Sequence, residues 1–473
     1  MGFLKRKNTK KEARMKKFIV IALALFLAIP AISFAGSATS RWDVTIGGYI
    51  KADFGYTTQL QGADYYKAER GSKGVYDNLA DEYGNYFSAG GETRLNFLIK
   101  GPDGWGAKTI GFIEADFSGR TAGTSTQGRD YGNFALRHAF MKMQWTNDAL
   151  TIGHTWQKWG LMPSFANVLL GWNMLGAFQK GSRQPQIMWD HTFTKNFNMS
   201  FGIISPTDAY GTAGGAQKVN SFTESPYPFF EGEFSYTSDA CGKIGPWQML
   251  FSLSGFYGWE RPIYASAATT STNYACTATG CVGSVVQNPY SYDDKTESAW
   301  GAAFKGFIPI IPEKKGDKGG ALSLSGIIFA SQNPSWYLGP LTQGAYNTGS
   351  AVAPTYNYPR IFGGWAQMTY FFTDKFFISG WYGQMDFNNS RRFTNLTNAS
   401  GAYVNNNVIT GETQYIVNLS YDVNPAMRLG LEWDYIKTKY GNYGSPIPGS
   451  DGALYADRNG TMNAFRFGAW YFF

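Results

Sequence analysis

The chain closes with Thr461-Met-Asn-Ala-Phe-Arg-Phe-Gly-Ala-Trp-Tyr-Phe-Phe473, and this stretch decides the fold. In an extended strand, alternate side chains point to opposite faces. One face of the stretch carries Phe465, Phe467, Ala469, Tyr471 and Phe473, and the other carries Ala464, Arg466 and Gly468. This alternation over about ten residues is typical of a transmembrane β-barrel, whose strands face lipid on one side and a lumen on the other. We therefore predict a barrel strand here.

The same alternation recurs toward the beginning of the chain. Residues 411–422 and 426–438 both show it, and only Val423-Asn424-Pro425 separates them. Extended along the whole chain, the pattern predicts sixteen strands, at residues 42–58, 91–100, 105–118, 132–145, 149–158, 184–191, 197–205, 228–237, 247–259, 296–306, 320–331, 361–372, 376–388, 411–422, 426–438 and 461–473.

The connections between these expected strands alternate in length. Short ones are expected at 101–104, 146–148, 192–196, 238–246, 373–375 and 423–425, with a longer exception at 307–319. Long ones are expected at 59–90, 119–131, 159–183, 206–227, 260–295, 332–360, 389–410 and 439–460. Short turns at one end and long loops at the other are typical of outer-membrane barrels. The predicted fold class is therefore all-β, a transmembrane antiparallel β-barrel of 16 strands.

The first 35 residues are expected to be a cleaved signal peptide. Lys16 and Lys17 precede an apolar segment at residues 18–29, and Ser33-Phe34-Ala35 forms a small-x-small cleavage site. That apolar segment is shorter than the roughly 20 residues that a membrane-spanning helix needs. Met15 is an alternative start, because the signal is already complete after it. Residues 36–473 are expected to form a single transmembrane barrel domain.

Charge and composition exclude other classes. Removing the eight basic residues and one acidic residue of the leader from totals of 41 and 34 leaves 33 of each, so nucleic acid is not an expected partner. No apolar run of about 18 residues follows residue 35, and neither βαβ alternation nor amphipathic helices are present. Cys276 and Cys281 lie in a Ser/Thr/Ala-rich loop, where an oxidising periplasm would allow a disulfide, although two incidental thiols are the alternative.

The candidate functional residues are charged and polar side chains that the alternation places on the inward face, together with one loop. The 25-residue connection 159–183 contains Lys180 and Arg183 but few acidic groups, so we expect it to fold inward as a constriction that presents positive charge. The expected lumen and constriction residues are Lys51, Asp53, Arg94, Glu114, Asp116, Arg137, Lys180, Arg183, Gln186, Arg428, Glu432 and Arg466.

We further expect a transverse field across this lumen. Arg94 and Arg137 would lie on its positive side, with Glu114 and Asp116 opposite, and such a field would orient solutes and attract carboxylates. For any single residue, the alternative is that its charge only solvates the lumen. Aromatic residues near the strand ends are expected to form interfacial girdles. A sugar-stacking ladder through Trp156, Trp159 and Trp172 is the alternative for some of them.

Short motifs also suggest a family. Gly153-His154-Thr155-Trp156 ends one expected strand, and Arg183-Gln184-Pro185-Gln186-Ile187 opens the next. These motifs resemble the Gly-Gln-x-Trp and Arg-Gln-Pro-Gln motifs of the trimeric dicarboxylate-channel (DcaP-like) porins, with His154 in the place of Gln. Gly48 to Asp53 resembles the first strand of that family, and Leu136 to Phe140 a later one. The resemblance covers mainly residues 42–205 and implies a homotrimer. Phe473 resembles the terminal Phe of other outer-membrane barrels.

These observations favour a porin of the bacterial outer membrane, a passive diffusion channel for small hydrophilic solutes, with anions favoured by the loop cations. The expected surroundings are outer-membrane lipid and lipopolysaccharide. One alternative is a barrel that forms a sleeve around a partner, such as an electron-transfer protein. Another is an outer-membrane hydrolase. None of His138, His154 and His191 lies in a hydrolase signature, and no Cys-x-x-Cys-His motif is present. We therefore expect neither an enzyme nor a cofactor.

Overall fold

The computed structural model describes most of the chain from residue 42 onward. The described residues are 42–60, 67–70, 72–73, 83–117, 134–160, 183–205, 227–260, 271–277, 280–286, 297–332, 346–347, 356–357, 360–388, 409–441, 454–455 and 458–473. The chain divides into two compact units, Met1–Asp43 and Val44–Phe473, and the strands from Val44 onward lie in the second. Among the described residues, no helix is long and apolar enough to cross a membrane.

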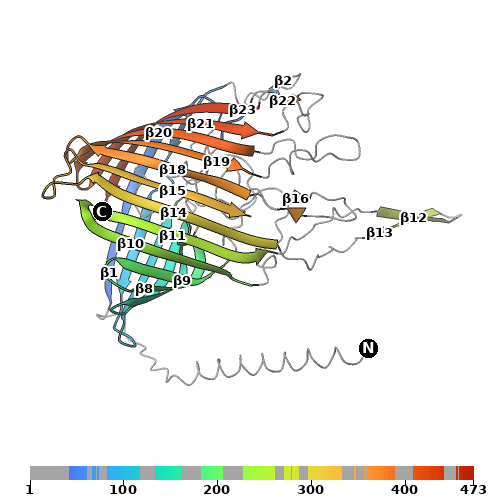
Figure 1. Ribbon diagram of the computed structural model, residues 1–473. Helices are drawn as coiled ribbons and strands as arrows, with labels where there is room; N and C mark the ends of the chain where they lie inside the picture. Colours follow the sequence, from blue (N-terminus) through green and yellow to red (C-terminus); the bar gives the residue numbers. More distant parts are fainter. Residues whose placement is uncertain are drawn as a thin grey trace. The chain divides into compact units, whose positions relative to one another are not determined.

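Antiparallel strands run side by side around one closed barrel (Figure 1). In chain order they are β1 (Asp43–Thr57), β3 (Asn85–Ala89), β4 (Arg94–Lys100), β5 (Lys108–Asp116), β6 (Ala135–Gln144), β7 (Asp148–Trp156), β8 (Arg183–Thr192), β9 (Phe197–Ile204), β10 (Phe229–Ile244), β11 (Trp247–Glu260), β14 (Glu297–Ile311), β15 (Leu322–Gln332), β18 (Arg360–Phe371), β19 (Phe376–Phe387), β20 (Ile409–Asn424), β21 (Met427–Tyr440) and β23 (Asn459–Phe472). The barrel closes where β1 pairs with β23.

β3 and β4 are two parts of one barrel strand, because both pair with β1 and only residues 90–93 separate them. The described barrel therefore has 16 strands, which confirms the predicted fold class. Two smaller hairpins lie within the long connections: β12 (Ser271–Thr277) with β13 (Gly280–Val286), and β16 (Tyr346–Asn347) with β17 (Tyr356–Asn357). A third short pairing joins two different connections, β2 (Ser72–Lys73) with β22 (Leu454–Tyr455).

Three predicted strand ends were wrong, and one of them is at 306, where β14 continues to Ile311. The expected turn 238–246 is mostly strand, because β10 continues to Ile244 and only Gly245 and Pro246 form the turn. A register shift between Ser238 and Lys243 absorbs the small and polar residues that had suggested a turn, as a β-bulge does. The second barrel strand begins at Asn85 rather than at 91, since Gly90 and Gly91 interrupt it without ending its pairing with β1.

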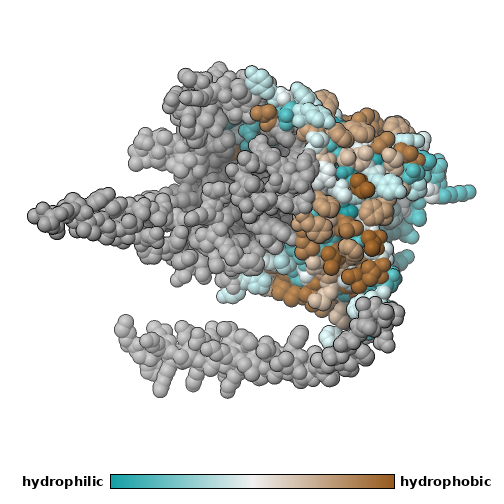
Figure 2. All heavy atoms as spheres, turned by 180° about the vertical axis from the view of Figure 1, so that it is seen from behind, coloured by the Kyte–Doolittle hydropathy of each residue, from teal (hydrophilic) through white to brown (hydrophobic). Residues whose placement is uncertain are grey.

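The two faces of the wall differ as the alternation predicts. In β23, the side chain of Phe465 is 52% exposed on the outer face, whereas Arg466 is 4% exposed on the inner face. Figure 2 shows apolar residues gathered on the outer wall and hydrophilic residues at its rim. We call the rim with the short turns, such as residues 372–375, the turn end. The opposite rim, from which the long connections leave, is the loop end.

Candidate functional site

The charged residues of β1 begin the candidate site. Lys51 and Asp53 are two residues apart, so they share the inner face, and the Nζ of Lys51 lies 3.1 Å from Oδ2 of Asp53. Lys51 also forms an ion pair with Glu92, which lies in the gap between β3 and β4. The backbone N–H of Lys51 donates to Oγ1 of Thr93, 3.2 Å away. The interruption of the second strand thus brings a carboxylate to Lys51.

A β-bulge places a second group of charges beside the first. Glu114 of β5 pairs in register with His138 of β6, and Ala115 pairs with Leu136, so Arg137 is the extra residue. Bulges re-aim side chains, and here the Nε of Arg137 reaches Oε1 of Glu114 at 2.9 Å. The Nη1 of Arg137 lies 2.9 Å from Oδ2 of Asp116.

Arg94 joins the same group from β4. Its Nε lies 3.6 Å from Oε1 of Glu114, and its guanidinium lies over the ring of Tyr49, 5.0 Å from the centroid. We call the residues Lys51, Asp53, Glu92, Arg94, Glu114, Asp116 and Arg137 the charged wall. The expectation that Glu114 and Asp116 lie opposite Arg94 and Arg137 was wrong. All four lie on adjacent strands, where side chains in register are about 5 Å apart, and they pair directly.

On another part of the wall, the chain turns into the lumen after β7. The Nζ of Lys158 lies 2.8 Å from Oδ1 of Asp190 on β8. Burial alone would lower the pKa of Lys158, but the Asp190 carboxylate raises that pKa above its ordinary value. The backbone N–H of Trp159 donates to Oε1 of Glu231 on β10, at 2.5 Å. Two wall carboxylates therefore hold the start of the 159–183 connection.

Lys305 of β14 completes this attachment. Its Nζ donates to the backbone oxygen of Lys158 at 2.7 Å and also forms an ion pair with Glu233 of β10. The hydroxyl of Ser252 donates to the same Glu233 carboxylate at 2.8 Å. We call Lys158, Trp159, Asp190, Glu231, Glu233 and Lys305 the loop anchor. It spans β8 to β14 on the inner wall.

Packing of the Trp159 ring also holds the start of the 159–183 connection against the wall. The indole is fully buried, with ring centroids 5.0 Å from Phe256 and 6.1 Å from Phe329, both edge-on. A Cβ added to Gly301 would lie 2.3 Å from the Phe256 ring and 2.7 Å from the indole, so the packing of these two rings requires a glycine there. Because the ring is enclosed by protein, Trp159 does not offer a stacking surface to sugars. Trp172 and Lys180 lie outside the described residues.

The Arg183 and Gln186 side chains lie where the loop leaves β7. The side-chain amide of Gln186 donates to the backbone oxygens of Thr155 and Trp156, at 2.8 and 3.0 Å. The Arg183 guanidinium lies 4.7 Å from the ring centroid of Trp156. Arg183 and Gln186, the first and last residues of the Arg-Gln-Pro-Gln motif, therefore stabilise the end of β7.

The remaining expected lumen residues lie on β20 to β23. Glu432 and Arg466 are partners in register, and the amide of Asn418 donates to Oε2 of Glu432 at 3.0 Å. Arg428 lies near the turn end, where its guanidinium forms two hydrogen bonds with Asp422, at 2.5 and 2.9 Å. In register, Trp470 of β23 lies between Arg428 and Lys51 of the charged wall.

Sequence reasoning missed Glu92, Lys158, Asp190 and Lys305 as site residues. Lys305 could have been predicted from the sequence, because it lies between Phe304 and Gly306 at an inward-facing position of an otherwise apolar strand. Glu92 and Lys158 could not, since both lie at strand ends where alternation stops. His138, which lies in the motif at 136–140, bonds through Nδ1 to Oγ1 of Thr155 at 2.9 Å.

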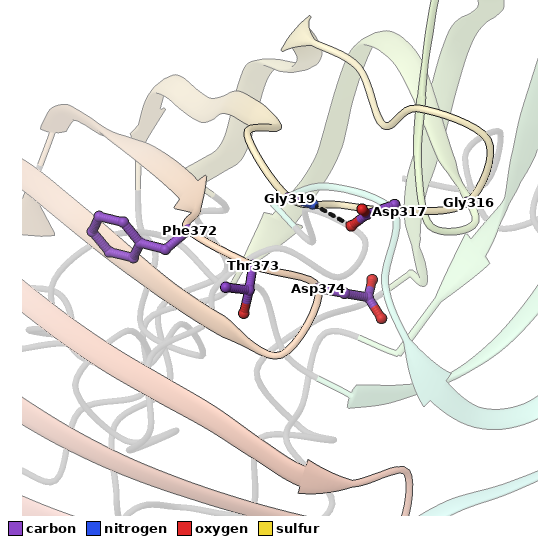
Figure 3. Close-up of a pocket in the computed structure, with 6 residues that line it drawn as sticks. All are labelled: Gly316, Asp317, Gly319, Phe372, Thr373 and Asp374. Atoms are coloured by element: carbon purple, nitrogen blue, oxygen red, sulfur yellow. Dashed lines mark hydrogen bonds between the residues drawn. The ribbon is translucent and has the colours of Figure 1, made fainter.

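Within the described ranges, no group of three or more His, Cys, Asp or Glu side chains is arranged to hold a metal. A surface hollow at the turn end is lined by Gly316, Asp317, Gly319, Phe372, Thr373 and Asp374 (Figure 3). Asp317 there accepts the N–H of Gly319 at 2.8 Å, and Asp374 accepts that of Lys318 at 3.3 Å. These carboxylates stabilise turns, and the lumen remains the candidate site.

Fold and lumen together define a class: a closed 16-strand transmembrane barrel with a charged inner wall and a loop that starts inward. No protein-family model matches the chain, and no curated protein does. Among solved structures, the chain is similar to the outer membrane channel DcaP of Acinetobacter baumannii, with a TM-score of 0.60, 15% identity, and coverage of 93% of this chain and 99% of that one. It is also similar to an anion-selective porin from Comamonas acidovorans, with a TM-score of 0.49, 12% identity, and coverage of 91% and 100%.

The first of these structures carries the argument on fold. It confirms that the chain resembles the DcaP-like porins in architecture, as the motifs at 153–156 and 183–187 indicated. At 15% identity the likeness concerns the fold alone.

Proposed function

We propose that the protein is a porin of the bacterial outer membrane, a passive diffusion channel for small hydrophilic solutes. The observation that carries this proposal is the charged wall on the inner face of a closed 16-strand barrel. Charged side chains in a dry interior would be costly, whereas a water-filled lumen solvates them. Barrels of about this strand number are wide enough to leave an aqueous channel.

The outer face supports the membrane location. Large apolar side chains, including Phe234, Leu253 and Ile328, are exposed there, as lipid contact requires. The solved structure of similar fold is described as an outer membrane channel. We further propose that residues 1–35 are removed on export, that lipid and lipopolysaccharide surround the barrel, and that it assembles as a homotrimer.

The charged wall does not by itself favour anions. Its three cations, Lys51, Arg94 and Arg137, face the carboxylates Asp53, Glu92, Glu114 and Asp116 at short range. A preference for anions would have to come from cations such as Lys180 in the constriction loop. We therefore propose that the loop, rather than the charged wall, sets any preference for dicarboxylates or other anions.

Planar-bilayer recording of the purified protein tests the proposed function. We expect stepwise conductance, with steps in groups of three if the protein is trimeric. The mass of the mature protein should correspond to a chain that begins at Gly36. Liposome swelling with sugars, amino acids and dicarboxylates then ranks the solutes. Folded barrel without any conductance would refute the porin and favour a sleeve for a partner protein or a hydrolase.

A further inference from the structure

A second segment lies inside the barrel, away from the loop anchor. Residues 67–70, which we call the strap, belong to the long connection between β1 and β3. Ala68 is fully buried in one apolar cluster with Ile436, Met462 and Ala464. These three side chains are on the inner faces of β21 and β23, so the strap lies against the lumen wall. Ile436 is four residues from the end of β21, or about 13 Å along the strand.

Hydrogen bonds attach the strap backbone to β21. The N–H of Ala68 donates to Oγ1 of Thr438 at 2.8 Å, and the hydroxyl of Tyr440 donates to the backbone oxygen of Ala68 at 2.7 Å. Arg70 donates to the backbone oxygen of Gly441 at 3.2 Å. Its guanidinium also lies over the Tyr440 ring, 4.8 Å from the centroid. Both backbone groups of Ala68 are therefore satisfied by side chains of one strand.

The ends of the strap are held as well. The side-chain amide of Gln59 donates to the backbone oxygen of Glu69 and accepts its N–H, both at 2.8 Å. Directly after the strap, Ser72 and Lys73 pair with Tyr455 and Leu454 in the connection that leads to β23. The segment is thus attached on three sides, which is unlike a loop tip exposed to solvent.

The close approach of the strap to β23 requires a glycine. A Cβ added to Gly460 would lie 2.2 Å from the backbone oxygen of Glu69 and 2.5 Å from that of Ala68. Backbone atoms cannot move aside as a flexible side chain can, so any other residue at 460 would push the strap away. Gly460 therefore provides a selective way to displace the strap.

The strap and the loop anchor lie on opposite walls. Around the 16-strand barrel, with β3 and β4 counted as one strand, β10 is eight strands from β23 in either direction. The strap contacts β21 and β23, and the backbone of Trp159 is bonded to β10. We propose that the strap is a second constriction element, so that two segments from opposite walls bound the aperture at the loop end. This inference rests on the proposed porin function.

Gly460→Val tests the strap directly, because it displaces the segment without altering a charge. Single-channel conductance should rise roughly twofold, and larger sugars should enter liposomes faster, since conductance and size exclusion follow the narrowest cross-section. The matched control is Gly380→Val, where an added side chain meets open space and the conductance should not change.

A second variant avoids steric strain. The double substitution Thr438→Val with Tyr440→Phe removes the two groups that bind Ala68, and it should also raise the conductance. It also removes the donation of the Thr438 hydroxyl to Oε2 of Glu412, which lies on β20 and not in the strap. Its control, Thr461→Val with Tyr435→Phe, removes the same two hydroxyl groups from the outer faces of β23 and β21. This control should leave the conductance unchanged.

The two proposals fail in different ways. If the unaltered protein does not conduct at all, the porin function fails. If it conducts, and folded Thr438→Val/Tyr440→Phe protein has the same conductance and sugar cut-off, then the strap does not bound the aperture and the inference is overturned. A rise in both strap variants, with neither control affected, supports it.

Discussion

The charged wall and the loop anchor contain the same kinds of residues, but the first joins strands of the barrel and the second attaches a loop to them. In the charged wall, ion pairs join side chains of adjacent strands, and Arg94 retains 20% of its side-chain exposure. In the loop anchor, Lys305 retains 2%, and it bonds to the backbone of a segment that leaves the wall. Burial alone does not separate the two groups, because Lys51 of the charged wall retains 3% and Lys158 of the loop anchor 31%. Bonds to the backbone of the departing segment, made by Lys305 and Glu231, distinguish the loop anchor.

The largest expected effect comes from breaking the loop anchor at Lys305. In Lys305→Met, the backbone oxygen of Lys158 loses its donor, and Glu233 keeps the Ser252 hydroxyl as its described donor. Removing one partner of a buried pair costs about 3 kcal/mol, the lower end of the usual range, because Glu233 remains partly exposed. Urea unfolding of the reconstituted protein should show this loss.

The control is Lys108→Met, which breaks the exposed ion pair with Asp103 at the turn end. Exposed pairs contribute little, so its unfolding midpoint should match that of the unaltered protein. Equal midpoints for the Lys305 and Lys108 variants would show that the loop anchor stabilises the fold no more than an exposed ion pair does.

The next largest effect concerns the position of the loop. In Gly301→Val, the added side chain meets both the Phe256 ring and the Trp159 indole, so their packing is lost and the start of the 159–183 connection should leave the wall. Conductance should rise roughly twofold, as for the strap, because the cross-section widens. Any preference for anions should also fall, because the cations of the loop move away from the path of the ions. A folded variant with unaltered conductance would mean that the indole does not hold the loop in place.

The sequence allowed good prediction of the strands but not of the contacts between their side chains. The face on which a strand residue lies can be predicted from the local sequence alone. For this reason, the alternation at 461–473 predicts which residues share a face with Arg466. The meeting of Arg137 with Glu114 depends on a bulge, and a one-residue shift changes every partner. Lys305 contacts a residue 147 positions away, whose place follows from the path of a loop. No local pattern encodes that path.

A smaller effect is expected at the charged wall, where the charges pair with one another and not with the backbone of a loop. Arg137→Ala removes the cation that pairs with both Glu114 and Asp116, so the wall becomes more negative. Reversal potentials in a salt gradient should shift toward cations. The shift should shrink as salt rises, because the screening length falls below about 10 Å above 0.1 M. Conductance itself should change little, since the loop anchor is intact.

Lys108→Ala is the matched control for charge, because its side chain is exposed at the turn end. It should leave the reversal potential unchanged. An Arg137→Ala protein with the same selectivity as this control would place the charged wall outside the conducting path. The charges of the wall and of the anchor would then both be structural.

The smallest expected effect is that of the hairpin β12 and β13, which lies outside both regions. The backbone register places Cys276 directly opposite Cys281, and cross-strand neighbours are about 4.5 to 5.5 Å apart, within the range that a disulfide spans. We propose that these two cysteines form a disulfide after export. Alkylation of the denatured, unreduced protein should then modify only Cys241, and prior reduction should expose all three thiols. Because the bond closes a short hairpin within a long connection, reduction should leave conductance and selectivity unchanged. Three alkylated thiols without reduction would show that Cys276 and Cys281 are free, and a change of conductance on reduction would show that the hairpin contributes to the aperture.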